Sequence, residues 1–208
     1  MPQDPDNGSS SASGVIPDAE LRELIGGGQI TANVPIDDDQ IQPASLDLRL
    51  GHTATRLRAS FLAGPDSAVG DRLGDLAMHR VDLTGGAVLE KGCVYLVELQ
   101  ERLALPDTLS AVANAKSSTG RLDLLTRTIT DRGVEFDRVS PGYHGPLYAE
   151  ICPRSFSVLV RPGMRLNQLR LRRGDAVLSD GDLAERHARN PLVLSEGDSP
   201  PAHIEDGL

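Results

Sequence analysis

The feature that most limits how this chain can fold is a succession of short apolar segments separated by turn residues. Such segments occupy 81–83, 87–89, 93–97 and 109–115. Turn signals recur there at intervals of roughly 8–12 residues, a spacing typical of β-sandwiches and β-barrels. The chain also holds 21 glycines, 14 prolines and no tryptophan, which suits many short strands joined by turns. We therefore predict a mainly β fold, a barrel or sandwich with a few short helices.

The length of 208 residues suits one domain of ordinary size with tails. Residues 1–14 are polar and Ser-rich and are expected to form a disordered lead, residues 15–173 the folded domain, and residues 174–208 a helix and a linker-like tail. Expected helices lie at 17–25, near 71–78 and at 180–188, and further strands at 40–51, 53–58, 103–105, 122–129, 147–151, 157–160 and 166–171.

Charge and cysteine content narrow the class of protein. A formal net charge of −9 argues against a general binder of nucleic acid or membrane surfaces, because both need a broad basic field. The sequence shows no signal-peptide pattern and no apolar stretch of membrane-spanning length. Cys93 and Cys152 are too few for a disulfide framework. We expect a cytoplasmic protein without membrane or nucleic-acid partners.

A basic region lies inside this acidic chain. Residues 113–173 contain 11 Lys and Arg against 5 Asp and Glu. Within it, Lys116-Ser117-Ser118-Thr119-Gly120-Arg121 offers hydroxyls, cations and the backbone N–H groups of a turn or helix start, which match the oxygens of a phosphate chain. The alternative is a capped turn with a surface Lys and Arg.

Glu150 interrupts the otherwise apolar strand 147–151. A carboxylate buried on a strand needs a partner or a purpose, so Glu150 is a candidate catalytic residue. The alternative is a glutamate at an edge or on the outward face. Asp47 and Arg49 alternate with leucines on another expected strand, and we expect them to pair with neighbouring charges.

The order of four segments resembles the dCTP deaminase branch of the trimeric dUTPase-like superfamily. These segments are Gln-Pro-Ala-Ser-Leu-Asp-Leu-Arg-Leu-Gly (42–51), Lys-Ser-Ser-Thr-Gly-Arg (116–121), Pro-Gly-Tyr-His-Gly-Pro-Leu-Tyr-Ala-Glu (141–150) and Pro-Gly-Met-Arg-Leu-Asn-Gln-Leu (162–169). The resemblance is nearest to the N-terminal module of long, two-module dCTP deaminases. It would make this chain a fragment that lacks a second module.

The resemblance implies a dUTPase-like β fold that assembles as a homotrimer, with sites between subunits. It implies a pyrimidine deoxynucleoside triphosphate as substrate, with Glu150 as the catalytic residue and Lys116, Ser117, Ser118 and Arg121 on the phosphates. Mg²⁺ would accompany the triphosphate. Zinc deaminases carry His-x-Glu and Pro-Cys-x-x-Cys. Here His203-Ile204-Glu205 lies in the tail and the two cysteines stand far apart, so no zinc is predicted.

Four further residues are candidates for the nucleoside end of the site. Ser140 stands where relatives usually carry Asp before Pro-Gly, and Asp137, three residues upstream, is a candidate substitute. Tyr143 is expected to shape the turn before the catalytic strand. Gln168 lies where some relatives have a polar residue near the base, although a satisfied strand glutamine is the better interpretation.

The leading hypothesis is zinc-independent hydrolysis of dCTP to dUTP and ammonia. One alternative is a dUTPase or a bifunctional enzyme, which needs a base near the phosphorus and a glycine-rich Phe arm; neither is recognisable here. Another is a nucleotide-binding half-module whose catalysis requires a second module.

Overall fold

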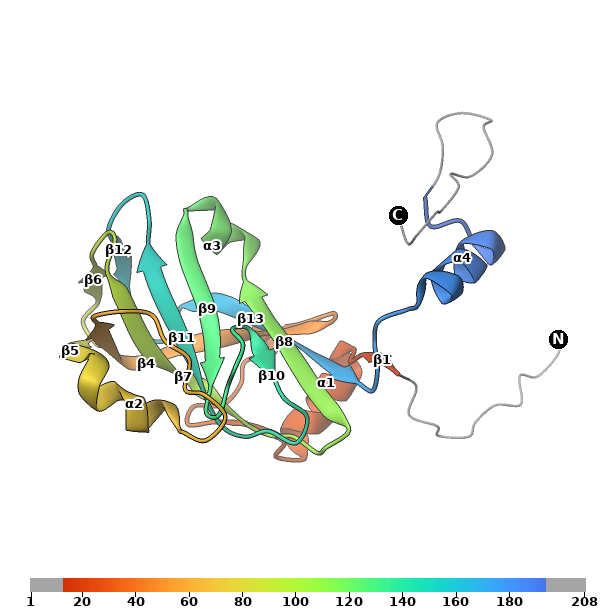
Figure 1. Ribbon diagram of the computed structural model, residues 1–208, viewed down its shortest axis with the longest axis horizontal. Helices are drawn as coiled ribbons and strands as arrows, with labels where there is room; N and C mark the ends of the chain where they lie inside the picture. Colours follow the sequence, from red (N-terminus) through yellow and green to blue (C-terminus); the bar gives the residue numbers. More distant parts are fainter. Residues whose placement is uncertain (1–12, 194–208) are drawn as a thin grey trace. The chain divides into compact units, whose positions relative to one another are not determined.

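A computed structural model describes residues 13–193, which divide after Gly174 into two compact units (Figure 1). Most of the expected lead 1–14, and the tail beyond residue 193, lie outside the described residues. The first unit is mainly β, which confirms the predicted fold class. None of the helices within residues 13–193 is long and apolar enough to cross a membrane.

Eleven strands of the described chain form one sheet, whose main path runs β10-β8-β13-β4-β7-β11-β9. The strands on this path are β4 (Ser45–Leu57), β7 (Val94–Ala104), β8 (Leu109–Ala115), β9 (Leu124–Thr130), β10 (Arg138–Val139), β11 (His144–Pro153) and β13 (Arg165–Arg173). Short strands β1 (Gly14–Val15), β2 (Ile30–Ala32), β3 (Ile41–Gln42) and β5 (Ala77–Asp82) pair with it from the side. A separate pair is formed by β6 (Ala87–Leu89) and β12 (Val158–Val160).

The two ends of this path meet at Asp137, so the sheet curls into a nearly closed barrel. The N–H of Asp137 donates to the carbonyl of Thr128 on β9 (2.9 Å), and its carbonyl accepts from the N–H of Ala113 on β8 (2.8 Å). Asp137 adopts a φ of +61°, in the left-handed region that a short polar side chain tolerates better than a branched one. Residues 130–140, which follow the strand expected at 122–129, therefore contain a further strand and the closure of the barrel.

Two faces of the sheet are buried by different sets of side chains. The interior holds the main core, to which alternate residues of the strands contribute, such as Leu46, Leu48 and Leu50 of β4. On the other face of β7, β9 and β11 a smaller cluster forms around Leu57, Val69, Leu96 and Ile129. Helix α2 (Val69–Leu76), near the expected short helix, and the segment before it supply part of that second cluster.

The remaining helices are short. In the first unit they are α1 (Asp18–Gly26), the 3₁₀ turn η1 (Asp38–Gln40) and α3 (Ser117–Arg121). The second unit contains α4 (Asp180–Arg189), which begins at Ser179, whose hydroxyl accepts from the N–H of Asp182 (3.1 Å). These positions agree with the expected helices at 17–25 and 180–188 within one residue at each end.

Two strand boundaries drawn from the sequence were wrong. The expected strands 40–51 and 53–58 are largely one long strand, β4, because Gly51 marks an irregularity in its pairing with β7 rather than an end. A Cβ at Gly51 would lie 2.4 Å from the carbonyl oxygen of Glu98, so only glycine permits this close approach. Likewise 93–97 and 103–105 belong to one strand, β7, because its charged residue Glu101 is buried with a partner and does not end the strand.

Candidate active site

Strand β11 places Glu150 on the face of the sheet that carries the second hydrophobic cluster. Its direct partners in the sheet are Arg127 on β9 and Leu96 on β7. Paired residues of antiparallel strands project to the same side, so Glu150 lies among apolar side chains and beside one arginine. Glu150 is only 2% exposed. Glu150 lies on the outer face of the barrel but is neither at an edge nor exposed, so the alternative of a solvated glutamate is wrong for this chain.

Arg127 neutralises the buried carboxylate. Its Nη2 donates to Oε1 of Glu150 at 2.5 Å and its Nε donates to the same oxygen at 3.1 Å. The guanidinium also donates to the hydroxyl of Ser60 (2.9 Å) and lies over the ring of Phe136, 3.8 Å from its centroid. No described residue bonds to Oε2 of Glu150, although this atom is buried. An unpartnered buried oxygen is uncommon and calls for an explanation.

Asp137 lies close enough to this pair to interact with it electrostatically. Its Oδ1 accepts from the N–H of Thr128 (2.7 Å). Burial raises the pKa of the Asp137 carboxyl, and the negative charge of Glu150 acts in the same direction, whereas the Thr128 N–H and Arg127 oppose them. The structure thus brings two of the sequence-derived site residues, Glu150 and Asp137, into one neighbourhood.

Lys116 stands at the N-terminal end of α3 and forms an ion pair with Asp47 of β4. Asp47 is 3% exposed in its side chain, against 29% for Lys116. Its other oxygen, Oδ1, is buried without a hydrogen-bond partner in the described chain. The expected pairing of Asp47 is therefore confirmed, and its partner is a residue assigned to the phosphates.

Three other members of the basic segment lie at the surface. Ser117, Ser118 and Arg121 are exposed, and no hydrogen bond or ion pair joins their side chains to other described residues. Thr119 is buried instead, and its hydroxyl donates to the carbonyl of Leu166 (3.0 Å), which attaches α3 to β13. The segment is thus anchored by Thr119 and Lys116 and presents two hydroxyls and a cation to solvent.

Arg49 and Glu101 form a separate buried ion pair. Glu101 is fully buried. Its Oε1 accepts hydrogen bonds from Nε of Arg49 (2.8 Å) and from the side-chain amide of Gln40 (3.0 Å). Its Oε2 accepts one from the backbone N–H of Arg49 (2.8 Å). Arg49 uses its remaining N–H groups on the carbonyls of Val34 and Pro35. Both carboxylate oxygens are satisfied here, as buried charges require.

The remaining candidates lie apart from the Glu150–Arg127 pair in their contacts. Tyr143 donates its hydroxyl to the carbonyl of Pro146 (2.5 Å) and accepts from the N–H of Asp131 (3.2 Å). Burial raises the pKa of Tyr143 to about 12. These bonds hold the turn before β11, the role expected for Tyr143. Gln168 contacts the side chains of Asn114 and Ser45 at 3.4 and 3.5 Å, as a strand glutamine would.

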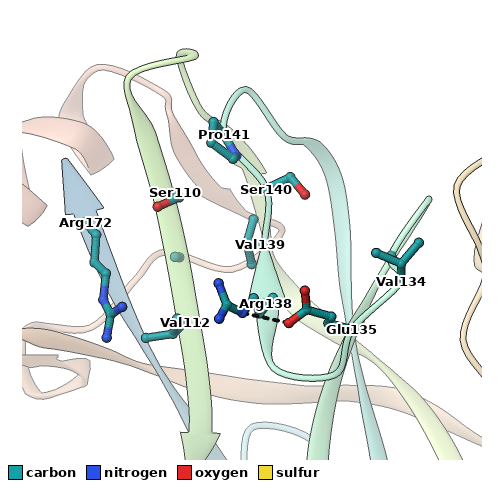
Figure 2. A pocket seen from close by; sticks show the side chains of 11 residues that line it. Ser110, Val112, Val134, Glu135, Arg138, Val139, Ser140, Pro141 and Arg172 are labelled. Carbon is teal, nitrogen blue, oxygen red and sulfur yellow. Dashed lines mark ion pairs between the residues drawn. The ribbon is translucent and has the colours of Figure 1, made fainter. Parts of the chain in front are cut away.

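Ser140 lines a hollow of about 320 Å³ at the start of β8, which Figure 2 shows. Two arginines reach it: Arg172 from β13, and Arg138, whose Nε is 2.8 Å from Oε2 of Glu135. Neither Glu150 nor Lys116 is among its lining residues.

Sequence reasoning missed Arg127, Ser60 and Phe136. Arg127 looked like one of many cations in a basic region, and its pairing with Glu150 follows only from the register of β9 against β11. A basic residue between the apolar Leu125 and Ile129 was the available signal. Within the described residues, no group of three or more His, Cys, Asp and Glu is arranged to hold a metal ion.

Comparison with known proteins defines the class. The family model of the 2'-deoxycytidine 5'-triphosphate deaminase (DCD) N-terminal domain matches residues 12–175. A crystal structure of 2'-deoxycytidine 5'-triphosphate deaminase from Agrobacterium tumefaciens is 51% identical with a TM-score of 0.83, and the match covers 87% of this chain and 55% of that chain. This chain therefore spans little more than half the length of that protein. Both comparisons identify a β-rich nucleotide deaminase domain.

Curated relatives lead to the same family. A dCTP deaminase of Haloarcula marismortui is 31% identical over 159 residues, which is 74% of this chain and 78% of the relative. A dUMP-forming dCTP deaminase of Beutenbergia cavernae is 30% identical over 156 residues, covering 74% of this chain and 77% of the relative. The chain belongs to the dCTP deaminase family of enzymes and matches its N-terminal domain, which confirms the resemblance drawn from the sequence.

Proposed function

We propose that this protein hydrolyses dCTP to dUTP and ammonia without zinc, with Glu150 as the catalytic residue. The observation that carries the proposal is the buried carboxylate of Glu150, which has one oxygen bound by Arg127 and the other unpartnered. A proton carrier needs an oxygen that is free of fixed donors. The family supports cytosine nucleotide chemistry, since its relatives are named for dCTP deamination.

One carboxylate is sufficient for the proton transfers. Glu150 takes a proton from water while the water oxygen bonds to C4 of cytosine, and the proton passes to N3. Glu150 then takes the proton of the new hydroxyl and gives it to the 4-amino group. The C4–N bond breaks, ammonia leaves and the C4 carbonyl of uracil forms. The sum is dCTP and water giving dUTP and ammonia.

The basic segment is the proposed triphosphate site. Ser117, Ser118 and Arg121 are exposed and uncommitted to other described side chains, so they are available to phosphate oxygens. Lys116 contributes charge from its pair with Asp47. The substrate is proposed to bind as its Mg²⁺ complex, with the ion held by phosphate oxygens.

For the nucleoside end we propose Asp137, whose interaction with Glu150 and Arg127 supports its place beside the base. Ser140, Tyr143 and Gln168 remain proposed contributors, with Tyr143 acting through the turn before β11. The side chains of Lys116 and Glu150 pair with different residues, Asp47 and Arg127. From the family resemblance we propose that a homotrimer completes each site from neighbouring subunits. We propose that this enzyme acts in the cytoplasm.

A second candidate is a bifunctional enzyme that also releases pyrophosphate. It is favoured by the relatives named dUMP-forming, and by Asp137, a carboxylate near Glu150 that is a candidate substitute for the aspartate usual before Pro-Gly. The two candidates differ in the product, dUTP or dUMP. A half-module that binds nucleotide without catalysis also remains, because the chain matches 55% of the Agrobacterium protein.

The test is ammonia release from dCTP by the 208-residue chain and by Glu150→Gln. The variant should lose at least about 10²-fold in kcat while its Kd for dCTP stays within a few-fold, since only the proton carrier is removed. Glu98→Gln, an exposed glutamate on β7, is the matched control and should be fully active. Near-normal turnover by Glu150→Gln would end the catalytic assignment.

Product analysis in the same assay separates dUTP from dUMP. Magnesium removal should depress turnover and a zinc-selective chelator should not. Binding of dCTP without ammonia release by the wild-type chain would favour the half-module.

A further inference from the structure

We infer that Arg127 is the positioning residue of this site: it fixes Oε1 of Glu150 and leaves Oε2 as the oxygen that exchanges protons. This inference rests on the proposed function, because it concerns how Glu150 is presented for catalysis. Arg127 stands opposite Glu150 in the β9–β11 register. A cross-strand pair of this kind is held by two strands of the barrel rather than by a loop.

The geometry of the pair is asymmetric. A fork-to-fork arrangement would engage both carboxylate oxygens with two parallel bonds. Here both N–H donors, Nη2 at 2.5 Å and Nε at 3.1 Å, converge on Oε1 of Glu150. The acceptor sites of Oε1 are thereby used and those of Oε2 stay open. A carboxylate held in this way offers water one defined oxygen.

Arg127 is itself held in place from two further sides. Its Nη2 donates to the Ser60 hydroxyl at 2.9 Å, and Phe136 lies under the guanidinium plane. The Arg127 side chain is 29% exposed. Its buried part is held by these two contacts and by the ion pair with Glu150. Ser60 comes from the segment after β4, and Phe136 from the segment before β10. Segments from three parts of the chain thus converge on one guanidinium.

Charge alone does not provide this arrangement. Lysine would neutralise Glu150 but has no planar fork, so it would not direct two bonds to Oε1 or stack flat on Phe136. Arg127→Lys therefore separates the effect of charge from the effect of orientation. A displaced catalytic group loses rate with little change in ground-state binding.

The experiment measures kcat, KM and direct dCTP binding for Arg127→Ala and Arg127→Lys. We expect kcat to fall about 10²-fold for Arg127→Ala and about tenfold for Arg127→Lys, with Kd for dCTP within about threefold of wild type. Added methylguanidinium should restore kcat of Arg127→Ala by about fivefold or more, because the partly exposed site can admit it. Arg80→Ala, which removes an exposed strand arginine, is the control and should keep wild-type kinetics.

A purely structural role would lower stability without rescue by methylguanidinium. The inference is overturned if a folded Arg127→Ala keeps kcat within twofold of wild type, or if methylguanidinium restores nothing. If Arg127→Ala fails to fold, Ser60→Ala decides: a severalfold fall in kcat at unchanged Kd supports the inference, and unchanged kcat overturns it. Failure of the proposed function has another signature, which is an active Glu150→Gln or a wild-type chain that releases no ammonia.

Discussion

The ion pair between Lys116 and Asp47 gives the basic segment a structural role that can be measured apart from any role in binding. Lys116→Met removes the cation and keeps much of the length and apolar stem of the side chain. Asp47 then remains as a carboxylate that is 3% exposed, with Oδ1 already unpartnered and Oδ2 newly so. Lys116→Met therefore lowers the free energy of unfolding, because a buried charge is left without compensation.

The expected loss can be bounded from the burial of the two partners. Breaking a fully buried ion pair by removing one member costs about 3–5 kcal/mol. Lys116 is 29% exposed, so water already screens the pair and the loss should be about 2–3 kcal/mol. Asp47→Asn removes the buried charge instead, and Lys116 can turn to solvent, so it should cost only about 1 kcal/mol.

Urea unfolding of the two single variants and the double variant tests this reasoning. Lys116→Met/Asp47→Asn should be about 1–2 kcal/mol more stable than the sum of the single losses predicts, because the uncompensated charge is gone. Additive losses, or a Lys116→Met loss below about 0.5 kcal/mol, would refute it. Binding of dCTP by the double variant adds a second readout. If Lys116 contacts the phosphates directly, binding stays weak even where stability returns.

Two other perturbations test the two ends of the site. Arg121→Ala should weaken dCTP binding about 10–100-fold, and Arg121→Lys should weaken it less, because exposed Arg121 is proposed to bind phosphate oxygens. Binding of deoxycytidine, which has no phosphate, should change little. Equal losses for the nucleotide and the nucleoside would show that the segment does not bind the phosphates. Burial is the main cause that raises the pKa of Asp137 above 3.8 in the folded state. The stability that Asp137 contributes through this shift is complete below its pKa in the unfolded chain and is lost as pH rises through its pKa in the folded protein. Asp137→Asn keeps the acceptor for the Thr128 N–H. Its free energy of unfolding, measured by urea titration, should therefore rise relative to wild type between pH 4 and pH 7. A difference between variant and wild type that stays constant or falls with pH would contradict this prediction.

The fold class could be predicted because it depends on local patterns. Apolar segments at short intervals and turn residues between them specify strands whatever their partners are. The ends of the strands were harder to predict from local patterns. Gly51 resembled a turn, and only the nearby carbonyl of Glu98 shows why a glycine is needed within β4. The strands expected at 93–97 and 103–105 left Glu101 between them, and its place within β7 depends on Arg49, a charge partner 52 residues away in sequence.

The sequence named separate candidate residues for the site and not the contacts between them. The motif order indicated Glu150 and the segment 116–121, and the family comparison supports both as belonging to a dCTP deaminase domain. The pairing of Arg127 with Glu150 depends on register across two strands, and the position of Asp137 near that pair depends on the closure of the barrel. Both are long-range features that no local pattern encodes. The two buried carboxylate oxygens that lack partners within the described residues, Oδ1 of Asp47 and Oε2 of Glu150, could not be predicted at all.

The buried carboxylates of this barrel are of two kinds, those with both oxygens hydrogen-bonded and those with one oxygen free of a donor among the described residues. Glu101 and Glu150 both interrupt apolar strands, both are buried, and both are paired with an arginine. Glu101 uses both oxygens on fixed donors, so a ligand or water would have to displace a bond to reach it. Glu150 and Asp47 each keep one oxygen open at the cost of an unsatisfied buried acceptor. Stability alone would favour a protein donor at that position, so an open oxygen beside an arginine held by Ser60 and Phe136 is the physical reason for proposing chemistry at Glu150 and a structural role for Glu101.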